Sequence, residues 1–220
     1  SVQAFTLLSL IGSGCHRLSE IAARVEKPAT HLSNALSFLT ELKYIRREIP
    51  FGESVRSTKR SLYKIDDPFL NFWFTFIVPE KSSIEFGDGS RVLKEIRKKI
   101  PLYISAIWEE LCRQSVPFIL KGIDFNPASR WWGKGIDGTR MEIDVVAEST
   151  DKKVLAIGEA KWSDNPDLEK EAANLLRKAL ILPFAKKQNI VPVLFVKKKP
   201  AASPDGVLVF GPDEVLEALT

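Results

Sequence analysis

The chain of 220 residues has few of the residues that build cross-links or soft metal sites. It contains two cysteines, Cys15 and Cys112, and two histidines, His16 and His31. Two thiols are too few for a disulfide framework or a four-thiolate zinc site, and neither histidine belongs to a cluster of metal ligands. No apolar run reaches the roughly 18 residues that a membrane span needs, and no basic-then-apolar leader is found. We therefore expect a reduced, cytoplasmic protein that does not interact with a membrane.

Positive charge is concentrated in the first third of the chain. Hydrophobic residues make up 45% and charged residues 27%, which excludes a disordered or collagen-like polymer. Residues 1–66 contain ten Lys and Arg against six Asp and Glu, whereas residues 67–220 contain 22 of each, so the net charge of +4 lies in the first segment. A local basic surface is typical of proteins that bind a phosphate backbone. We expect DNA as a partner; the alternative is an ordinary domain with a mild charge bias.

Residues 1–66 show the pattern of three helices followed by a hairpin. Apolar residues recur at helical spacing in the first part, and two short stretches near the end read as strands. The elements are expected at 2–11, 18–25, 30–42, 44–49 and 61–65. This order is that of a winged helix-turn-helix domain, in which the third helix lies in the major groove and the hairpin contacts the DNA backbone.

The recognition helix of such a domain is expected from Thr30 to Lys43 and carries no arginine. Arginine on guanine is the commonest specific base contact, so a sequence-selective transcriptional regulator is disfavoured. The domain either docks on DNA with little selectivity or serves as a protein-binding module or spacer. The hairpin would contact phosphates, which position a protein without specifying sequence. The candidate DNA-binding residues are His31, Ser33, Asn34 and Ser37 on the helix and Arg56, Lys59 and Arg60 on the wing.

The rest of the chain is predicted to form a helical connector at 67–100 and an α/β domain at 101–220. In the connector, Asp67 and Pro68 suit the start of a helix, and 79–90 reads as a linker. The short loop between the first two long strands of the second domain predicts an antiparallel hairpin. The expected helices and strands are 91–99, 102–114, 140–148, 154–162, 167–182, 191–196, 207–210 and 213–219.

Three charged residues interrupt the apolar strands of the second domain. Asp144 lies on one strand, and Glu159 and Lys161 project from the same face of the next because they are two residues apart. Burying a charge without a partner is costly, so these groups either satisfy one another or hold a metal. Carboxylate oxygens bind Mg²⁺, and a nearby lysine can orient a water or neutralise developing charge, which suits phosphodiester cleavage. The alternative is a buried Asp144–Lys161 ion pair that fixes strand register.

The same residues resemble the PD-(D/E)XK nuclease motif, with Asp144 followed fifteen positions later by Glu159-Ala160-Lys161. The resemblance implies a restriction-endonuclease-like mixed β-sheet flanked by helices. It also implies that Asp144, Glu159 and the Ala160 carbonyl bind Mg²⁺ or Mn²⁺ and that Lys161 is catalytic. Ile143 stands where the family often has proline.

Further functional residues have two readings each. Nucleases of this superfamily often add an acid from the preceding helix; Glu109 is the best match, or it simply faces solvent. Trp131, Trp132 and Trp162 either stack on bases or belong to the core. The run at 197–199 either contacts phosphate or is a solvated strand end.

The order of motifs along nearly the whole chain resembles the C-terminal part of the archaeal-type AAA ATPase family. The matching blocks are 63–74, Arg130-Trp131-Trp132 and Glu159-Ala160-Lys161-Trp162. In that family a P-loop ATPase precedes the winged helix. The sequence has no Gly-x-x-x-x-Gly-Lys-[Ser/Thr] motif, so either an ATPase domain precedes Ser1 in a longer chain or this copy lacks it. We expect a DNA-associated, metal-dependent nuclease; the alternative is an inactive DNA- or protein-binding module of such an ATPase.

Overall fold

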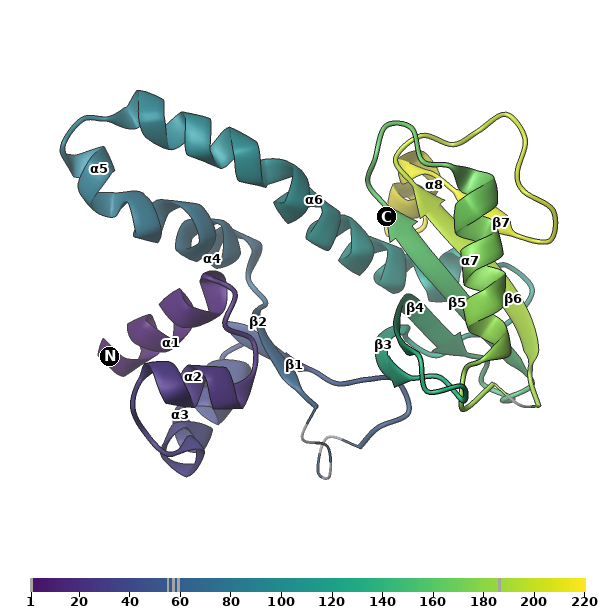
Figure 1. Cartoon of the computed structure of the whole chain (residues 1–220), viewed down its shortest axis with the longest axis horizontal. Helices are drawn as coiled ribbons and strands as arrows, with labels where there is room; N and C mark the ends of the chain where they lie inside the picture. The colour runs from purple at the N-terminus through teal and green to yellow at the C-terminus, as the bar shows by residue number, and fades with distance from the viewer. Residues whose placement is uncertain (1, 55, 57, 59, 186) are drawn as a thin grey trace. The chain divides into compact units, whose positions relative to one another are not determined.

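The computed structural model describes residues 2–54, 56, 58, 60–185 and 187–220. The chain divides into two compact units, Ser1–Lys99 and Ile100–Thr220, and helix α6 (Gly89–Ile119) contributes residues to both (Figure 1). None of the helices in the described part of the chain is both long enough and apolar enough to cross a membrane.

The first unit begins with helices and a hairpin in the order that the sequence predicts. Strands β1 and β2 pair antiparallel, with Ile45 opposite Ile65. The elements are α1 (Val2–Gly12), α2 (Leu18–Arg24), α3 (Ala29–Glu41), β1 (Ile45–Glu48), β2 (Leu62–Ile65), α4 (Pro68–Phe72), the π-helical turn η1 (Trp73–Ile77), η2 (Val78–Glu80) and α5 (Lys81–Glu85). Apolar residues of α1, α2, α3, β1, β2 and η1 share one core, which includes Leu7, Ile11, Ile21, Leu32, Leu36, Leu39, Ile45, Ile65 and Phe74.

The segment after the hairpin is more helical than the sequence indicates. Asp67 caps α4 as expected, its Oδ1 accepting a hydrogen bond from the Leu70 amide at 2.7 Å. The linker expected at 79–90 is wrong, because this stretch contains η2, α5 and the start of α6. The break expected at Pro101 is also wrong. Proline lacks one helix donor, but its fixed φ is close to the helical value, so α6 continues through Pro101 with hydrogen-bonded turns on both sides.

The second unit is built on a mixed five-stranded sheet, counted over the residues that the structure describes. The strand order is β3-β4-β5-β6-β7. Strands β3, β4 and β5 pair antiparallel, which confirms the expected hairpin, whereas β5, β6 and β7 pair parallel. The elements are β3 (Ser129–Lys134), β4 (Arg140–Glu148), β5 (Val154–Lys161), α7 (Leu168–Leu180), β6 (Asn189–Val196), β7 (Leu208–Phe210) and α8 (Pro212–Glu217).

Helices cover both faces of this sheet. The C-terminal half of α6 and helix α8 pack on one face; their core residues include Trp108, Cys112, Val116 and Val215 against Val145, Ala147, Ala156, Val193 and Phe195. Helix α7 connects the parallel strands β5 and β6 and contacts both (Figure 1). Because strand side chains alternate, Ala156 and Ala160 face α6, whereas Glu159 and Lys161 face α7.

Candidate functional site

The site lies where strands β4 and β5 separate, which we call the β4–β5 fork. The two strands pair from Val145 opposite Gly158 to Glu148 opposite Leu155. Beyond Val145, β4 pairs with β3 on its other edge, and beyond Gly158, β5 continues along β6. On the open side of the fork, the first residue of β4 is Asp144 and the first residue of β5 is Glu159. The fork therefore brings the two predicted acids to the point where the sheet opens.

Asp144 is fixed in the fork through both its side chain and its backbone. Its Oδ2 accepts a hydrogen bond from the Ala160 amide at 3.0 Å, replacing a bond that β4 backbone would otherwise supply. The Asp144 carbonyl accepts from Arg113 Nη1 at 2.9 Å. Arg113 is buried and its other nitrogen donates to Glu110 Oε2 at 2.9 Å. Glu110 therefore has a structural role, as the ion-pair partner of the buried Arg113.

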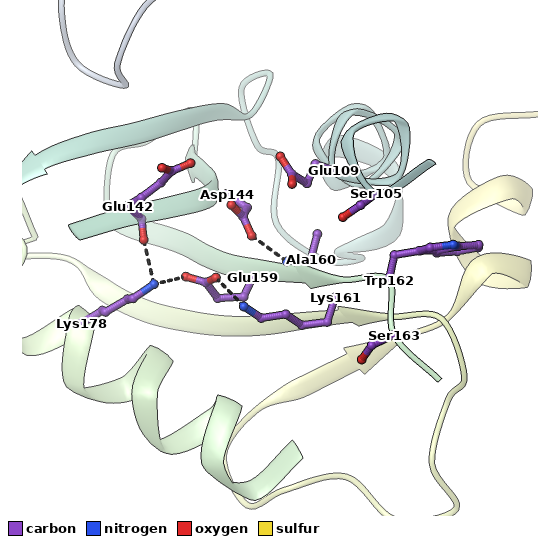
Figure 2. A pocket seen from close by; sticks show the side chains of 10 residues that line it. All are labelled: Ser105, Glu109, Glu142, Asp144, Glu159, Ala160, Lys161, Trp162, Ser163 and Lys178. Carbon is purple, nitrogen blue, oxygen red and sulfur yellow. Dashed lines mark hydrogen bonds and ion pairs between the residues drawn. The ribbon is translucent and has the colours of Figure 1, made fainter. Parts of the chain in front are cut away.

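Each oxygen of Glu159 is held by a different lysine. Lys178 Nζ, from the last turn of α7, lies 2.6 Å from Oε1, and Lys161 Nζ lies 3.3 Å from Oε2 (Figure 2). Lys161 also lies 3.2 Å from Oε2 of Glu171. Lys178 also donates to the Glu142 carbonyl at 2.8 Å. The expected acid–lysine cluster thus forms between Glu159 and Lys161, and the structure shows no Asp144–Lys161 ion pair among the described residues.

Burial and neighbouring charges shift the pKa values of Glu159 and Lys161. Burial, together with the charge of Asp144, raises the pKa of Glu159 above its usual range, and the two lysines oppose this shift. Burial alone would lower the pKa of Lys161, but the carboxylates of Glu159 and Glu171 outweigh it and raise that pKa. Repulsion between two carboxylates is relieved when a cation binds between them.

A cavity of about 390 Å³ opens beside the fork. It is lined by residues of the strands, of α6 and of α7, and Asp144, Glu159 and the two lysines bound to Glu159 all line it (Figure 2). Glu109, the additional acid expected from the preceding helix, does line this cavity, as does Ser105 one turn earlier on α6. The remaining lining residues are Glu142, Asp144, Glu159, Ala160, Lys161, Trp162, Ser163 and Lys178.

The donors at the fork fit a hard divalent cation that keeps part of its water shell. In the part of the chain that is described, no group of three or more Asp, Glu, His or Cys side chains is placed to hold a metal. Mg²⁺ normally takes one or two carboxylates from a protein and completes its shell with water and substrate oxygens. Asp144 and Glu159 supply two carboxylates that are close enough to raise the pKa of Glu159.

The predicted DNA-binding residues of the first unit lie on one helix and one loop. The structure ends α3 at Glu41, two residues before the predicted end, because Lys43 has a left-handed φ of 57°. Arg60 forms an ion pair with Glu53, and Arg56 is exposed, whereas Lys59 lies outside the described residues. The predicted base-reading side chains are all exposed on α3: His31, Ser33, Asn34 and Ser37.

The tryptophans of the second unit pack against other side chains. Trp131 is buried and makes an edge contact with Phe184, with ring centroids 5.4 Å apart. The ring centroids of Trp162 and Trp108 lie 5.3 Å apart, and Lys197 Nζ lies over the Trp162 ring, 5.6 Å from its centroid. These contacts are those expected of core residues. Trp132 is half-buried with Arg130 against its ring.

The run at 197–199 is tied down by acids. Lys197 and Lys198 lie 2.8 Å and 3.5 Å from Asp164, and Lys199 lies 2.5 Å from Glu214. These ion pairs match the reading of a solvated strand end.

Sequence reasoning missed the contributions of α7. Glu171 and Lys178 are seven residues apart, so both lie on the helix stripe that includes the buried Leu175. Charged residues on an otherwise apolar stripe were the available signal, but their partners depend on how α7 docks on the sheet.

Comparison with known proteins finds one matching family model. Residues 73–175 match a family model, DUF234, described as archaeal and bacterial proteins of unknown function. The matched stretch contains Asp144, Glu159 and Lys161.

One curated relative is an uncharacterized protein, MJECL04, of Methanocaldococcus jannaschii. It is 32% identical over 183 residues, which are 80% of this chain and 40% of the relative. The chain therefore spans less than half the length of that protein. Among solved structures, the protein of unknown function AF1548 is similar over 50% of this chain and 66% of its own, with 19% identity and a TM-score of 0.36.

Proposed function

We propose that the chain is a DNA-associated, metal-dependent nuclease that hydrolyses phosphodiester bonds at the β4–β5 fork. The observation that carries the proposal is the fork itself. It gathers Asp144, Glu159 and Lys161 from two strands beside one open cavity. Apolar strands gain nothing from two partly desolvated carboxylates unless these bind something.

Each residue of the fork then has a distinct role. Asp144, Glu159 and the Ala160 carbonyl would hold Mg²⁺ or Mn²⁺. When bound, such an ion lowers the pKa of a water and stabilises charge on phosphoryl oxygens. Lys161 keeps its proton, because its pKa is raised, and its ammonium therefore serves to orient a water or stabilise negative charge. Glu109 faces the same cavity from α6 and is positioned to contribute a further oxygen.

The arrangement of elements supports the finer reading of both units. A mixed sheet covered by helices, with acids at a splayed strand pair, is the arrangement that a restriction-endonuclease-like domain requires. Helices α1, α2 and α3 followed by an antiparallel hairpin are the arrangement of a winged helix. An ATPase domain in a longer chain, as in the archaeal-type family, is part of the proposal as a partner.

Charge supports a division of labour between the units. Residues 1–99 contain sixteen Lys and Arg against eleven Asp and Glu, a net charge of +5, whereas residues 100–220 contain sixteen against seventeen, a net charge of −1. A slightly acidic domain gains little from the DNA backbone. The first unit, with Arg56 exposed on the loop of its hairpin, is therefore the DNA-docking part.

Cleavage of plasmid and branched DNA in Mg²⁺ and in Mn²⁺ tests this function. Wild type should cut in at least one ion and not in EDTA. We expect Asp144→Asn to abolish detectable cleavage and Lys161→Met to lower the rate by about 10²–10³-fold, the usual effect of losing one charge-stabilising group. Glu169→Gln, on the exposed side of α7, is the matched control and should leave the rate unchanged. A wild type that cuts neither substrate in either ion contradicts the proposal.

A second function, an inactive DNA- or protein-binding module, is favoured by a different observation. Both oxygens of Glu159 are occupied by lysines, which is the state of an ion-paired structural acid. Phe38 on α3 and Leu42, directly after it, also expose their apolar side chains. DNA binding without cleavage, insensitive to Asp144→Asn, would select this alternative.

A further inference from the structure

We propose that Lys178 is a resident counter-cation that competes with a divalent ion for Glu159 and so weakens metal binding at the fork. The inference rests on the proposed function, since it concerns the same acid. It assigns a role to a residue of α7 that stands outside the motif in the sequence. The role follows from the placement of Lys178, from its second acceptor and from the charges around Glu159.

Lys178 makes the closer of the two contacts with Glu159. Its Nζ lies 2.6 Å from Oε1, against 3.3 Å for Lys161 and Oε2. Lys161 is shared with Glu171 at 3.2 Å, so part of its charge is directed elsewhere. Lys178 is therefore the principal cation that neutralises Glu159, and it holds the oxygen that faces β4 and Glu142 in Figure 2.

A second acceptor allows Lys178 to release Glu159 without leaving the site. The ammonium also donates to the Glu142 carbonyl at 2.8 Å. An ammonium that keeps one acceptor loses less when another is taken from it. Its side chain is 22% exposed, so water can supply the missing contact.

Charge counting gives the direction of the effect. Lys178 is the cation that offsets the charge of Glu159 most closely, since Lys161 is shared with Glu171. A divalent cation entering the fork meets an ammonium already bound to one of its proposed ligands. Removing Lys178 makes the fork more negative by one charge and frees one carboxylate oxygen of Glu159. At a partly exposed site, an ion pair such as that of Lys178 with Glu159 changes an equilibrium constant by about tenfold. The dissociation constant of the metal should change by a similar factor.

Titration of Mn²⁺ into the whole chain, followed by calorimetry, tests this role without measuring activity. Lys178→Met should tighten the Mn²⁺ dissociation constant about tenfold relative to wild type. Lys178→Arg keeps the charge and should bind as wild type does. Lys170→Met removes an exposed lysine from the same helix and should also leave the dissociation constant unchanged. Lys178→Gln replaces Lys178→Met if the latter does not fold.

Every other result overturns the proposal. Unchanged or weaker binding by Lys178→Met shows that Lys178 supports the site instead of competing with the ion. An equal gain in Lys170→Met shows a general charge effect, and failure of both neutral variants to fold shows a structural residue. Absence of Mn²⁺ binding in all proteins also overturns it. Failure here is distinct from failure of the nuclease function: DNA cleavage by wild type with no gain in Lys178→Met refutes the inference alone.

Discussion

Glu159 is 5% exposed and has another carboxylate, Asp144, as its neighbour. Burial and this neighbour raise its pKa, so the ionised form is less favourable in the folded chain than in the unfolded chain. The resulting loss of stability is absent well below the ordinary pKa of 4.5 and grows as the pH rises through the folded-state pKa. Ionised Glu159 thus lowers the stability of the fold, and under the proposed function this charge is the one that binds the metal.

Replacing Glu159 by a neutral isostere should therefore stabilise the fold while it removes the proposed metal ligand. We expect Glu159→Gln to have a higher melting temperature than wild type at neutral pH, with a difference that shrinks toward pH 4. Thermal melts followed by circular dichroism across this range measure it. Glu169→Gln is the control, and a lower melting temperature for Glu159→Gln at neutral pH would contradict this view of the fork.

His16 gives the opposite pH dependence in the first unit. Its Nδ1–H donates to the Tyr63 carbonyl at 2.9 Å, and burial lowers its pKa below 6.5. The folded chain then binds fewer protons than the unfolded chain, so stability should fall as the pH drops from 6.5 through the folded-state pKa.

A glutamine at this position cannot gain that proton. Urea unfolding at several pH values should show a smaller acid-induced loss of stability for His16→Gln than for wild type. His31→Gln, at an exposed site on α3, should behave as wild type does. Parallel curves for His16→Gln and wild type between pH 7 and pH 5 would refute this assignment.

At the residue scale, the sequence predicted the residues whose positions depend on strand pairing alone. Period-2 alternation put Glu159 and Lys161 on one face, and the short hairpin brought Asp144 to the neighbouring strand. It could not predict Lys178, since its distance from Glu159 depends on the angle at which α7 crosses the sheet.

At the scale of elements, the close approach of α1 to η1 depends on a glycine. A Cβ built on Gly12 would lie 2.6 Å from Cβ and 2.9 Å from the carbonyl carbon of Phe74. Backbone atoms at this distance cannot move aside without shifting the whole segment. Thr75 Oγ1 also donates to the Gly12 carbonyl at 3.3 Å, so the two segments are joined at this point.

Gly12→Ala should destabilise the first unit by about 1–3 kcal/mol, the usual range for overpacking. Urea unfolding gives the free energy. Gly89→Ala is the matched control, because a Cβ there meets nothing within 4 Å. Equal stability of the two variants would show that α1 and η1 are not packed as described.

Elements were predicted well where periodicity is strong and poorly where proline or small polar residues suggest a break. The amphipathic patterns of α2, α3 and α7 gave their positions within a few residues. Pro101 misled the reading of α6, since a long helix tolerates the loss of one hydrogen bond when neighbouring turns are intact. Local signals of this kind cannot reveal what the surrounding turns contribute.

At the scale of the whole molecule, the charge difference between the units predicts which unit contacts DNA under the proposed function. Binding should arise from the first unit and weaken with salt. With about three phosphate contacts, affinity for duplex DNA should fall roughly 40-fold between 50 and 200 mM salt.

Substitutions in each unit separate its contribution. Arg56→Ser should reduce the magnitude of the slope of log affinity against log salt by about one, the contribution of one phosphate contact. Lys121 is exposed in the second unit, and Lys121→Ser should leave the slope unchanged. Fluorescence anisotropy with labelled duplex measures both. A salt-independent affinity, or a larger effect from Lys121, would place DNA docking elsewhere.

The most direct test of the central claim is Mn²⁺-induced broadening of backbone amide resonances in the whole chain. The Ala160 amide donates to Asp144 Oδ2 at 3.0 Å, so a paramagnetic ion held by the fork must lie close to it. We predict that the Ala160 signal disappears first as Mn²⁺ is added and that it persists in Asp144→Asn. Retention of the Ala160 signal in wild type, while amides elsewhere broaden, would contradict a metal site at the fork.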